Sequence, residues 1–116
     1  MFSFSAVTAQ AAVHELQPTA LKALLVSEPA AVFLLDVRTT PEFNGGHLVG
    51  TTLVPMNDVP KRVAEIPKNR KVVVMCATGA RSSAVARYLD QAGYPWVANL
   101  TGGVMSWMRQ GLPVAR

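Results

Sequence analysis

The stretch KVVVMCATGARSSAVARYL, Lys71–Leu89, joins a run of valines that predicts a buried strand to a pattern of apolar residues that predicts a helix. The only cysteine of the chain, Cys76, lies at the junction between the two elements. Small residues, a glycine and an arginine follow it, whereas a cysteine with a packing role would more naturally lie inside the strand or the helix. The junction is therefore a candidate active site.

The residues after Cys76 favour a negatively charged sulfur. Backbone N–H groups in the first turn of a helix have no partner within the helix, and the helix dipole attracts an anion to them. Gly79, between two small residues, allows the loop to curl so that successive N–H groups point inward, and Arg81 adds a positive charge. We expect this environment to lower the pKa of Cys76. The alternative, an inert cysteine buried at the end of a strand, leaves the glycine and the arginine without a role.

The length of the loop limits what the cysteine can hold. Four residues separate Cys76 from Arg81. Protein tyrosine phosphatases have one more, which leaves room for a phosphate, so the shorter loop suits a smaller group such as one extra sulfur atom. A persulfide of this kind is a reversible state of a thiolate. A metal site is not indicated, because Cys76, His14 and His47 show no ligand spacing, and a dithiol redox motif requires a second cysteine.

Strand-like and helix-like segments alternate along the rest of the chain. Short apolar runs predict strands, and stretches with helical periodicity or with proline and glycine at their ends predict helices. The predicted strands are 31–37, 51–56, 71–75 and 96–100, and the predicted helices are 17–28, 59–67, 82–92 and 102–111, with a helical turn in 40–47. This alternation indicates an α/β domain with a mainly parallel central sheet and helices on both faces.

In such sheets ligands gather at the carboxyl ends of the strands, so Asp36, Arg38 and Cys76 should lie along one edge. Asp36 and Arg38 are candidates to help shape the pocket, but we favour structural roles for both. Asp36 can bind loop N–H groups, and Arg38 can pair with Glu42 across the following turn. His47 is expected to hydrogen-bond the backbone of a turn.

Positive charge is concentrated in the second half of the chain. Residues 1–58 carry two basic and five acidic side chains, a balance of −3, and residues 59–116 carry nine basic and two acidic, a balance of +7. Part of this charge forms a local cluster of Lys61, Arg62, Lys68, Arg70 and Lys71. We interpret the cluster first as a solvated helix and loop, and alternatively as a positive field near the cysteine that attracts anions. Nucleic acid is disfavoured as a partner, because no aromatic residues are interleaved with the cluster.

Length and composition indicate a loose segment, 1–12, followed by one domain, 13–116. The 116 residues, 50% of them hydrophobic, suffice for one packed core. No apolar run approaches the roughly 20 residues of a membrane span. The first ten residues lack the basic start and apolar block of a signal peptide, so we expect a cytoplasmic protein, with export as the less favoured alternative. One cysteine fits a reducing compartment and requires thiol chemistry to be completed on another molecule.

Two segments resemble the rhodanese family. LLDVRTTPEFNGGHLVGTTLVPM, Leu34–Met56, is similar to the first signature of that family. VVVMCATGARSSAVARYLDQAGYPWVANLTGGVMSWMRQGLPV, Val72–Val114, is similar to its active-site loop, the following helix and the closing segment. The resemblance extends over nearly the whole chain from about Leu16 onward, and the length matches the single-domain form.

The resemblance implies a rhodanese-like fold and a sulfurtransferase that uses no metal and no organic cofactor. Cys76 would take the outer sulfur of a small anionic donor such as thiosulfate as a persulfide, and pass it to cyanide, a thiol or another protein. A non-catalytic sulfur-sensing or protein-binding module is the alternative. The residues expected to bind the substrate are Ala77, Thr78, Gly79, Ala80, Arg81 and Ser82.

The loop departs from the family in two ways that concern the donor. Many thiosulfate-using members have a basic residue directly after the cysteine, where this chain has Ala77, and the Gly-Ser-Gly-Val run of mercaptopyruvate-using members is absent. Thiosulfate remains the expected donor, held by Arg81 and the backbone. Thr78 is expected either to donate to the bound sulfur or to cap the loop, and Ser82 and Ser83 are first of all candidates for the helix N-cap.

Overall fold

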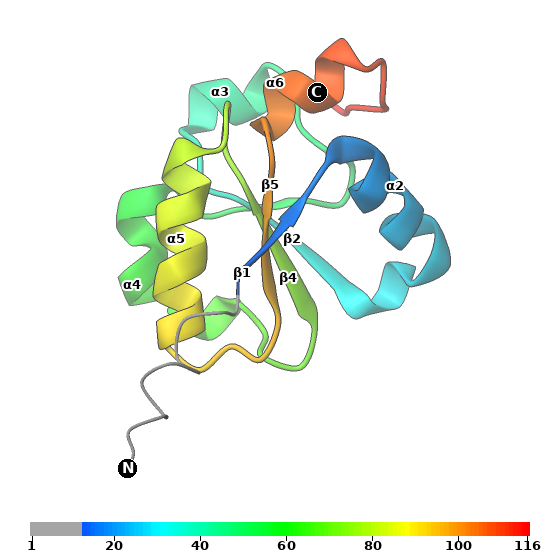
Figure 1. The fold of residues 1–116 in the computed structure, drawn as a ribbon. Helices are drawn as coiled ribbons and strands as arrows, with labels where there is room; N and C mark the ends of the chain where they lie inside the picture. The colour runs from blue at the N-terminus through cyan, green and yellow to red at the C-terminus, as the bar shows by residue number, and fades with distance from the viewer. Residues whose placement is uncertain (1–12) are drawn as a thin grey trace.

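A five-stranded sheet in which all the strands are parallel forms the centre of the computed structural model, which describes residues 13–116 (Figure 1). The order of the strands is β1-β5-β4-β2-β3. Their bounds are β1 Val13–Leu16, β2 Val32–Asp36, β3 Thr52–Leu53, β4 Lys71–Met75 and β5 Val97–Leu100. The expected α/β fold with a mainly parallel sheet is confirmed. The loose segment expected at 1–12 lies outside the described residues.

Helices cover both faces of the sheet (Figure 1). The α-helices are α2 Pro18–Ser27, α3 Thr40–Asn44, α4 Val59–Arg62, α5 Ala80–Gln91 and α6 Gly103–Arg109, and 3₁₀ turns occupy η1 Pro29–Ala31, η2 Met56–Asp58 and η3 Val63–Glu65. Along β4, Val72 and Val74 pack with α4 and α5, whereas Val73 and Met75 pack with α2 and α6. The valine run is continuous because both faces of the strand are buried. No helix in the part of the chain described here is long and apolar enough to cross a membrane.

The edge strand β1 is the element that the sequence did not predict. It has four residues, VHEL, and its two central side chains, His14 and Glu15, are exposed. A strand this short, with polar residues adjacent, shows no alternation that could distinguish it from a loop. It forms because the neighbouring strand β5 supplies hydrogen-bonding partners from Val97 to Leu100.

The carboxyl ends of the central strands meet at one edge of the sheet. In the register of the sheet Asp36 lies beside Met75, and Val74 lies beside Asn99. The loops that follow β2, β4 and β5 therefore leave the sheet side by side, and α3, α5 and α6 begin there (Figure 1). The expectation that Asp36 and Cys76 share an edge is confirmed.

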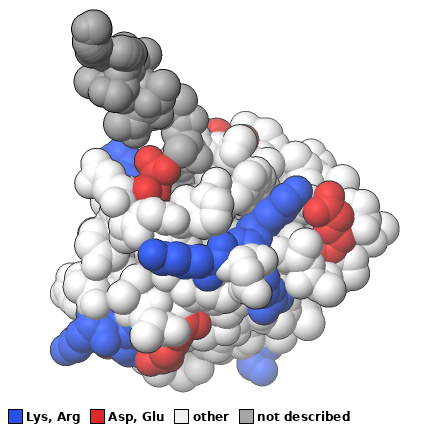
Figure 2. All heavy atoms as spheres, turned by 90° about the horizontal axis from the view of Figure 1, so that it is seen from below, with Lys and Arg blue, Asp and Glu red and all other residues white. Residues whose placement is uncertain are grey.

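Lys71 begins β4 and so lies at the opposite edge of the sheet from Cys76; Figure 2 views the molecule from below Figure 1 and shows several Lys and Arg side chains on that face. Lys71 is the first residue of β4 and Cys76 follows its last residue, so roughly 16 Å of extended chain separates the two. Lys71 is 3.2 Å from the carboxylate of Glu28, and its ammonium lies 5.3 Å from the centre of the Trp96 ring. Lys71 therefore lies well away from the cysteine, and Lys61, Arg62 and Lys71 each have a carboxylate partner close by.

Candidate active site

Cys76 follows β4 directly, and hydrogen-bond donors of the protein surround its sulfur. The residue is 1% exposed. Its Sγ accepts hydrogen bonds from the backbone N–H of Gly79 at 3.1 Å and of Ser82 at 3.4 Å, and from the Ser82 hydroxyl at 3.3 Å. The loop Cys76–Arg81, which we call the cysteine loop, thus turns peptide hydrogens toward the sulfur as expected from the sequence. A merely packed cysteine would lack these donors.

Two features outside the valine strand hold the cysteine loop in this shape. Gly79 has a φ of +111°, in a region that residues with a Cβ rarely adopt, and so the chain reverses immediately before α5. The first turn of α6 donates hydrogen bonds from Val104 N–H to the Cys76 carbonyl (2.9 Å) and from Met105 N–H to the Ala77 carbonyl (3.1 Å). Because α6 binds the carbonyls on one side, the N–H groups are free to face the sulfur.

The environment lowers the pKa of the Cys76 thiol. Burial alone raises that pKa, because it disfavours the thiolate. The hydrogen bonds from the Ser82 hydroxyl and from the N–H groups of Ser82, Gly79 and Thr78 act in the opposite direction, and together they outweigh burial. The thiolate is the nucleophilic form of cysteine, and a lowered pKa increases its share at any given pH below the pKa.

Arg81 forms a two-pronged ion pair with Glu42, which is 39 residues away in the sequence. Both guanidinium nitrogens, Nη1 and Nη2, lie 2.9 Å from a carboxylate oxygen of Glu42. This contact is the largest cause of the fall in the Glu42 pKa to about 2, and it raises the pKa of Arg81. Glu42 is itself held by the N-terminus of α3, where its carboxylate accepts a hydrogen bond from Thr39 N–H at 3.0 Å. The positive charge at the end of the cysteine loop is therefore anchored to a second element.

The predicted pairing of Arg38 with Glu42 is wrong. Arg38 instead binds Asp36, with Nη2 2.7 Å from Oδ2 and with its own backbone N–H 3.0 Å from Oδ1. Arg38 Nη2 also donates to the carbonyl of Gly46 at 2.8 Å. Arg38 pairs with Asp36 rather than with Glu42 because Asp36 is only two residues away and fully buried. A buried carboxylate requires a cation beside it, and Arg38 is the nearest. The structural role expected for both residues is confirmed, as is the backbone contact of His47, whose Nδ1 lies 2.9 Å from the carbonyl of Phe43.

The prediction that Ser82 or Ser83 caps the helix is wrong. Helix α5 begins at Ala80, and the N-cap position is occupied by Gly79 without any side-chain cap. Ser82 lies inside the first turn and is fully buried, and its hydroxyl approaches both the sulfur and the side chain of Asn99. Ser83 accepts a hydrogen bond from Arg87 instead.

Two further residues connect to the cysteine through Ser82 and were not identified from the sequence. Asn99 is 4% exposed, and its Oδ1 lies 2.5 Å from the Ser82 hydroxyl. Its Nδ2 donates to Glu15 on β1 at 3.1 Å. The sequence did contain one sign of this contact: Asn99 is the only polar residue in the apolar run 96–100, and a buried polar side chain requires a hydrogen-bond partner.

The remaining candidates lie on or near the surface of the protein. Thr78 and Ala80 are exposed, and Ala77 is half-buried. A pocket of about 170 Å³ lies on the Arg81 side of the cysteine loop and is bordered also by Arg38 and Asn57. Within residues 13–116 no three His, Cys, Asp or Glu side chains lie close enough together to hold a metal ion.

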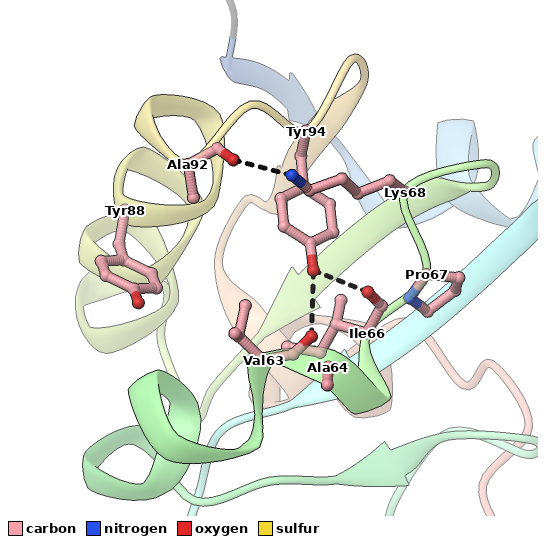
Figure 3. Close-up of a pocket in the computed structure, with 8 residues that line it drawn as sticks. All are labelled: Val63, Ala64, Ile66, Pro67, Lys68, Tyr88, Ala92 and Tyr94. Carbon is pink, nitrogen blue, oxygen red and sulfur yellow. Dashed lines mark hydrogen bonds between the residues drawn. The ribbon is translucent and has the colours of Figure 1, made fainter.

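A larger pocket of about 390 Å³ does not belong to this site (Figure 3). It lies against Tyr88 and Ala92 at the end of α5, whereas the cysteine loop lies at the start of that helix and includes its first two residues. The twelve residues of α5 span about 18 Å. Two side chains of this pocket have hydrogen-bond partners: the Tyr94 hydroxyl lies within hydrogen-bond distance of the carbonyls of Val63 and Ile66, and Lys68 donates to that of Ala92.

Known proteins with a similar sequence or fold include several sulfurtransferases. A family model described as the rhodanese-like domain matches residues 17–110. A sulfurtransferase from Allochromatium vinosum is 41% identical over 102 residues, which cover 88% of this chain and 94% of that protein. The thiosulfate sulfurtransferase GlpE from Tolumonas auensis is 35% identical over 77 residues, 66% of this chain and 73% of that protein. Among solved structures, a rhodanese-related protein from Thermoplasma volcanium has a TM-score of 0.80 at 26% identity and covers 88% of this chain and 97% of its own.

Proposed function

The chain belongs to the rhodanese-like domain family, and from that premise we propose that it transfers sulfane sulfur from a small anionic donor to a nucleophilic acceptor through a persulfide on Cys76. The observation that carries the proposal is the set of donors to the sulfur: two backbone N–H groups and one hydroxyl within 3.4 Å of Sγ. Such a set stabilises a thiolate before the donor arrives, and the anionic outer sulfur of a persulfide afterward.

In the first half-reaction the Cys76 thiolate attacks the outer sulfur of the donor. With thiosulfate, a new S–S bond forms as the S–S bond of the donor breaks, and sulfite leaves with the bonding electron pair. In the second half-reaction the acceptor attacks the outer sulfur of the persulfide, and Cys76 leaves as a thiolate. Electrons and protons balance within each step, so the proposed chemistry uses no metal and no organic cofactor.

We propose thiosulfate as the donor, and the residues that would bind it are Ala77, Thr78, Gly79, Ala80, Arg81 and Ser82. Arg81 supports this assignment because its guanidinium borders the pocket beside the cysteine loop and is held there by Glu42. The similarity to a protein named as a thiosulfate sulfurtransferase also supports it. The negative charge of Glu42 offsets part of the charge of Arg81, so the backbone N–H groups would supply much of the attraction for the donor.

The proposed acceptor is a thiol or another protein, with cyanide as an assay substitute. The chain has no second cysteine to receive the sulfur, so the acceptor must reach the site directly. The single thiol and its proposed chemistry suit a reducing compartment, and we propose the cytoplasm. We assign the whole activity to one domain, residues 13–116.

The mass of the intact protein after incubation with thiosulfate tests the proposal. We expect a gain of one sulfur atom that cyanide removes with release of thiocyanate, and no gain in Cys76→Ser. A gain that persists in Cys76→Ser, or no gain with thiosulfate or any other sulfane donor, would overturn the proposal. In the second case a sulfur-sensing or protein-binding module becomes the better assignment.

A further inference from the structure

A continuous hydrogen-bonded chain leads from the sulfur of Cys76 to the surface of the edge strand β1. The Ser82 hydroxyl lies 3.3 Å from Sγ and 2.5 Å from Oδ1 of Asn99. The other end of the same amide, Nδ2, lies 3.1 Å from Oε1 of Glu15. Thr101 donates to that carboxylate oxygen at 2.7 Å. Ser82 and Asn99 are buried, so water does not compete for their polar atoms.

The serine hydroxyl cannot serve both of its neighbours at once. It has one hydrogen to donate, and both the thiolate and a carbonyl oxygen are acceptors. An ionised carboxylate only accepts hydrogen bonds, so Glu15 requires the NH₂ end of the Asn99 amide to face it. The carbonyl end of the amide must then face Ser82, where it competes with the sulfur for the hydroxyl hydrogen.

We propose that Asn99 and Glu15 are positioning residues that act through Ser82: by fixing the orientation of the amide, Glu15 keeps the Asn99 carbonyl beside the Ser82 hydroxyl, where it competes for the hydrogen and weakens the hydrogen bond to the sulfur of Cys76. The thiolate then relies more on the backbone donors of the cysteine loop. A thiolate of higher pKa is intrinsically the stronger nucleophile, which favours attack on the donor. This inference deepens the proposed function and rests on it.

The pH dependence of Cys76 alkylation by iodoacetamide tests the inference without any sulfur donor. In Glu15→Gln the amide of Asn99 is free to reverse, and the Ser82 hydrogen becomes available to the thiolate. We expect the apparent pKa of Cys76 to fall by about half a unit, the size of a modest hydrogen bond. Thr101→Val loosens the same carboxylate without changing any charge, and we expect a shift in the same direction.

The matched control is Ser82→Ala, which removes the hydroxyl through which the effect must pass. In the Ser82→Ala background we expect Glu15→Gln to shift the pKa by less than half as much as in the wild-type chain. The other charged groups around the cysteine loop are Arg81 on α5, Glu42 on α3 and the Asp36–Arg38 pair after β2, and they are unchanged in all variants.

An undiminished shift in the Ser82→Ala background would show a direct charge effect of Glu15 and overturn the inference. The absence of a shift in both Glu15→Gln and Thr101→Val would also overturn it. Loading of the wild-type protein with thiosulfate tests the proposed function separately. A normal gain of sulfur with a failed alkylation cycle refutes only the inference, and no gain of sulfur refutes the proposed function.

Discussion

A methyl group at Gly103 is expected to damage the cysteine loop through direct overlap with its backbone. Gly103 opens α6 with a φ of +66°. A Cβ built there would lie 2.3 Å from the carbonyl oxygen of Ala77 and 2.5 Å from that of Cys76. Both are backbone atoms, which cannot rotate away as a side chain could. The variant Gly103→Ala therefore forces the helix and the loop apart.

The expected cost follows from the size of this overlap. Real Cβ atoms essentially never approach closer than 3.0 Å, so at least 0.7 Å of movement is needed at the Ala77 carbonyl. Overpacking of this kind costs about 1–3 kcal/mol of unfolding free energy, and the left-handed backbone adds about 1 kcal/mol for alanine. We expect a total of about 2–4 kcal/mol, and also weaker hydrogen bonds from α6 to the loop carbonyls.

Gly111→Ala is the matched control. Gly111 has a φ of +73° and no atom within 4 Å of its virtual Cβ, so it carries the backbone strain without the overlap. Urea unfolding should show a loss of about 1 kcal/mol in Gly111→Ala and a clearly larger loss in Gly103→Ala. Alkylation of Cys76 under native conditions should change only in Gly103→Ala. Equal losses in the two variants, with unchanged alkylation, would refute the view that α6 shapes the cysteine loop.

Three further predictions concern the charged groups of the site. Arg81→Ala should slow loading by thiosulfate about 10- to 100-fold and lower the unfolding free energy by no more than about 1–2 kcal/mol, the contribution expected of its partner Glu42; an unfolded variant would instead make Arg81 a structural residue. Glu42 has a pKa of about 2, below its ordinary value of 4.5. Its contribution to stability should be complete above pH 4.5 and disappear as the pH falls through 2, by about 1–2 kcal/mol once solvent screening is included. Urea unfolding at pH 5 and pH 2 should show this loss in the wild type but not in Glu42→Gln, and equal losses would contradict the pairing with Arg81. Finally, the alkylation rate of Cys76 should rise with pH and level off below the pH at which an ordinary thiol ionises; a profile at or above that of free cysteine would mean that burial outweighs the hydrogen bonds.

Most elements of the fold could be predicted from the sequence because they depend on local patterns. Continuous apolar runs in the sequence predict the buried strands β2 and β4. Gly93 has a left-handed conformation directly after α5, as expected for a residue that ends a helix. The exception among the strands was β1, which forms because it pairs with β5 and not because its own residues favour a strand. A four-residue strand of mixed polarity has no local preference strong enough to be recognised.

The candidate site divides in the same way. The curl of the cysteine loop and the lowered pKa of Cys76 could be anticipated, because they depend on a cysteine, a glycine and a helix start within a few residues. The partner of Arg81 could not be predicted, because Glu42 lies 39 residues away in the sequence. Arg38, only four residues from Glu42, was the more natural partner to expect for that carboxylate. The role of Ser82 was misassigned for a related reason: a serine near a helix start is most often a cap, unless the tertiary fold buries it against another strand.

The sequence alone determined that the cysteine lies between a buried strand and a helix, because strand, loop and helix are contiguous and each obeys short-range rules of periodicity and backbone freedom. Only the tertiary structure decided which groups surround that thiol. The first turn of α6 orients the peptide groups of the loop, Glu42 anchors Arg81, and Asn99 competes for the serine hydroxyl. These contacts join segments that become neighbours only after the sheet has assembled, so no local pattern specifies them.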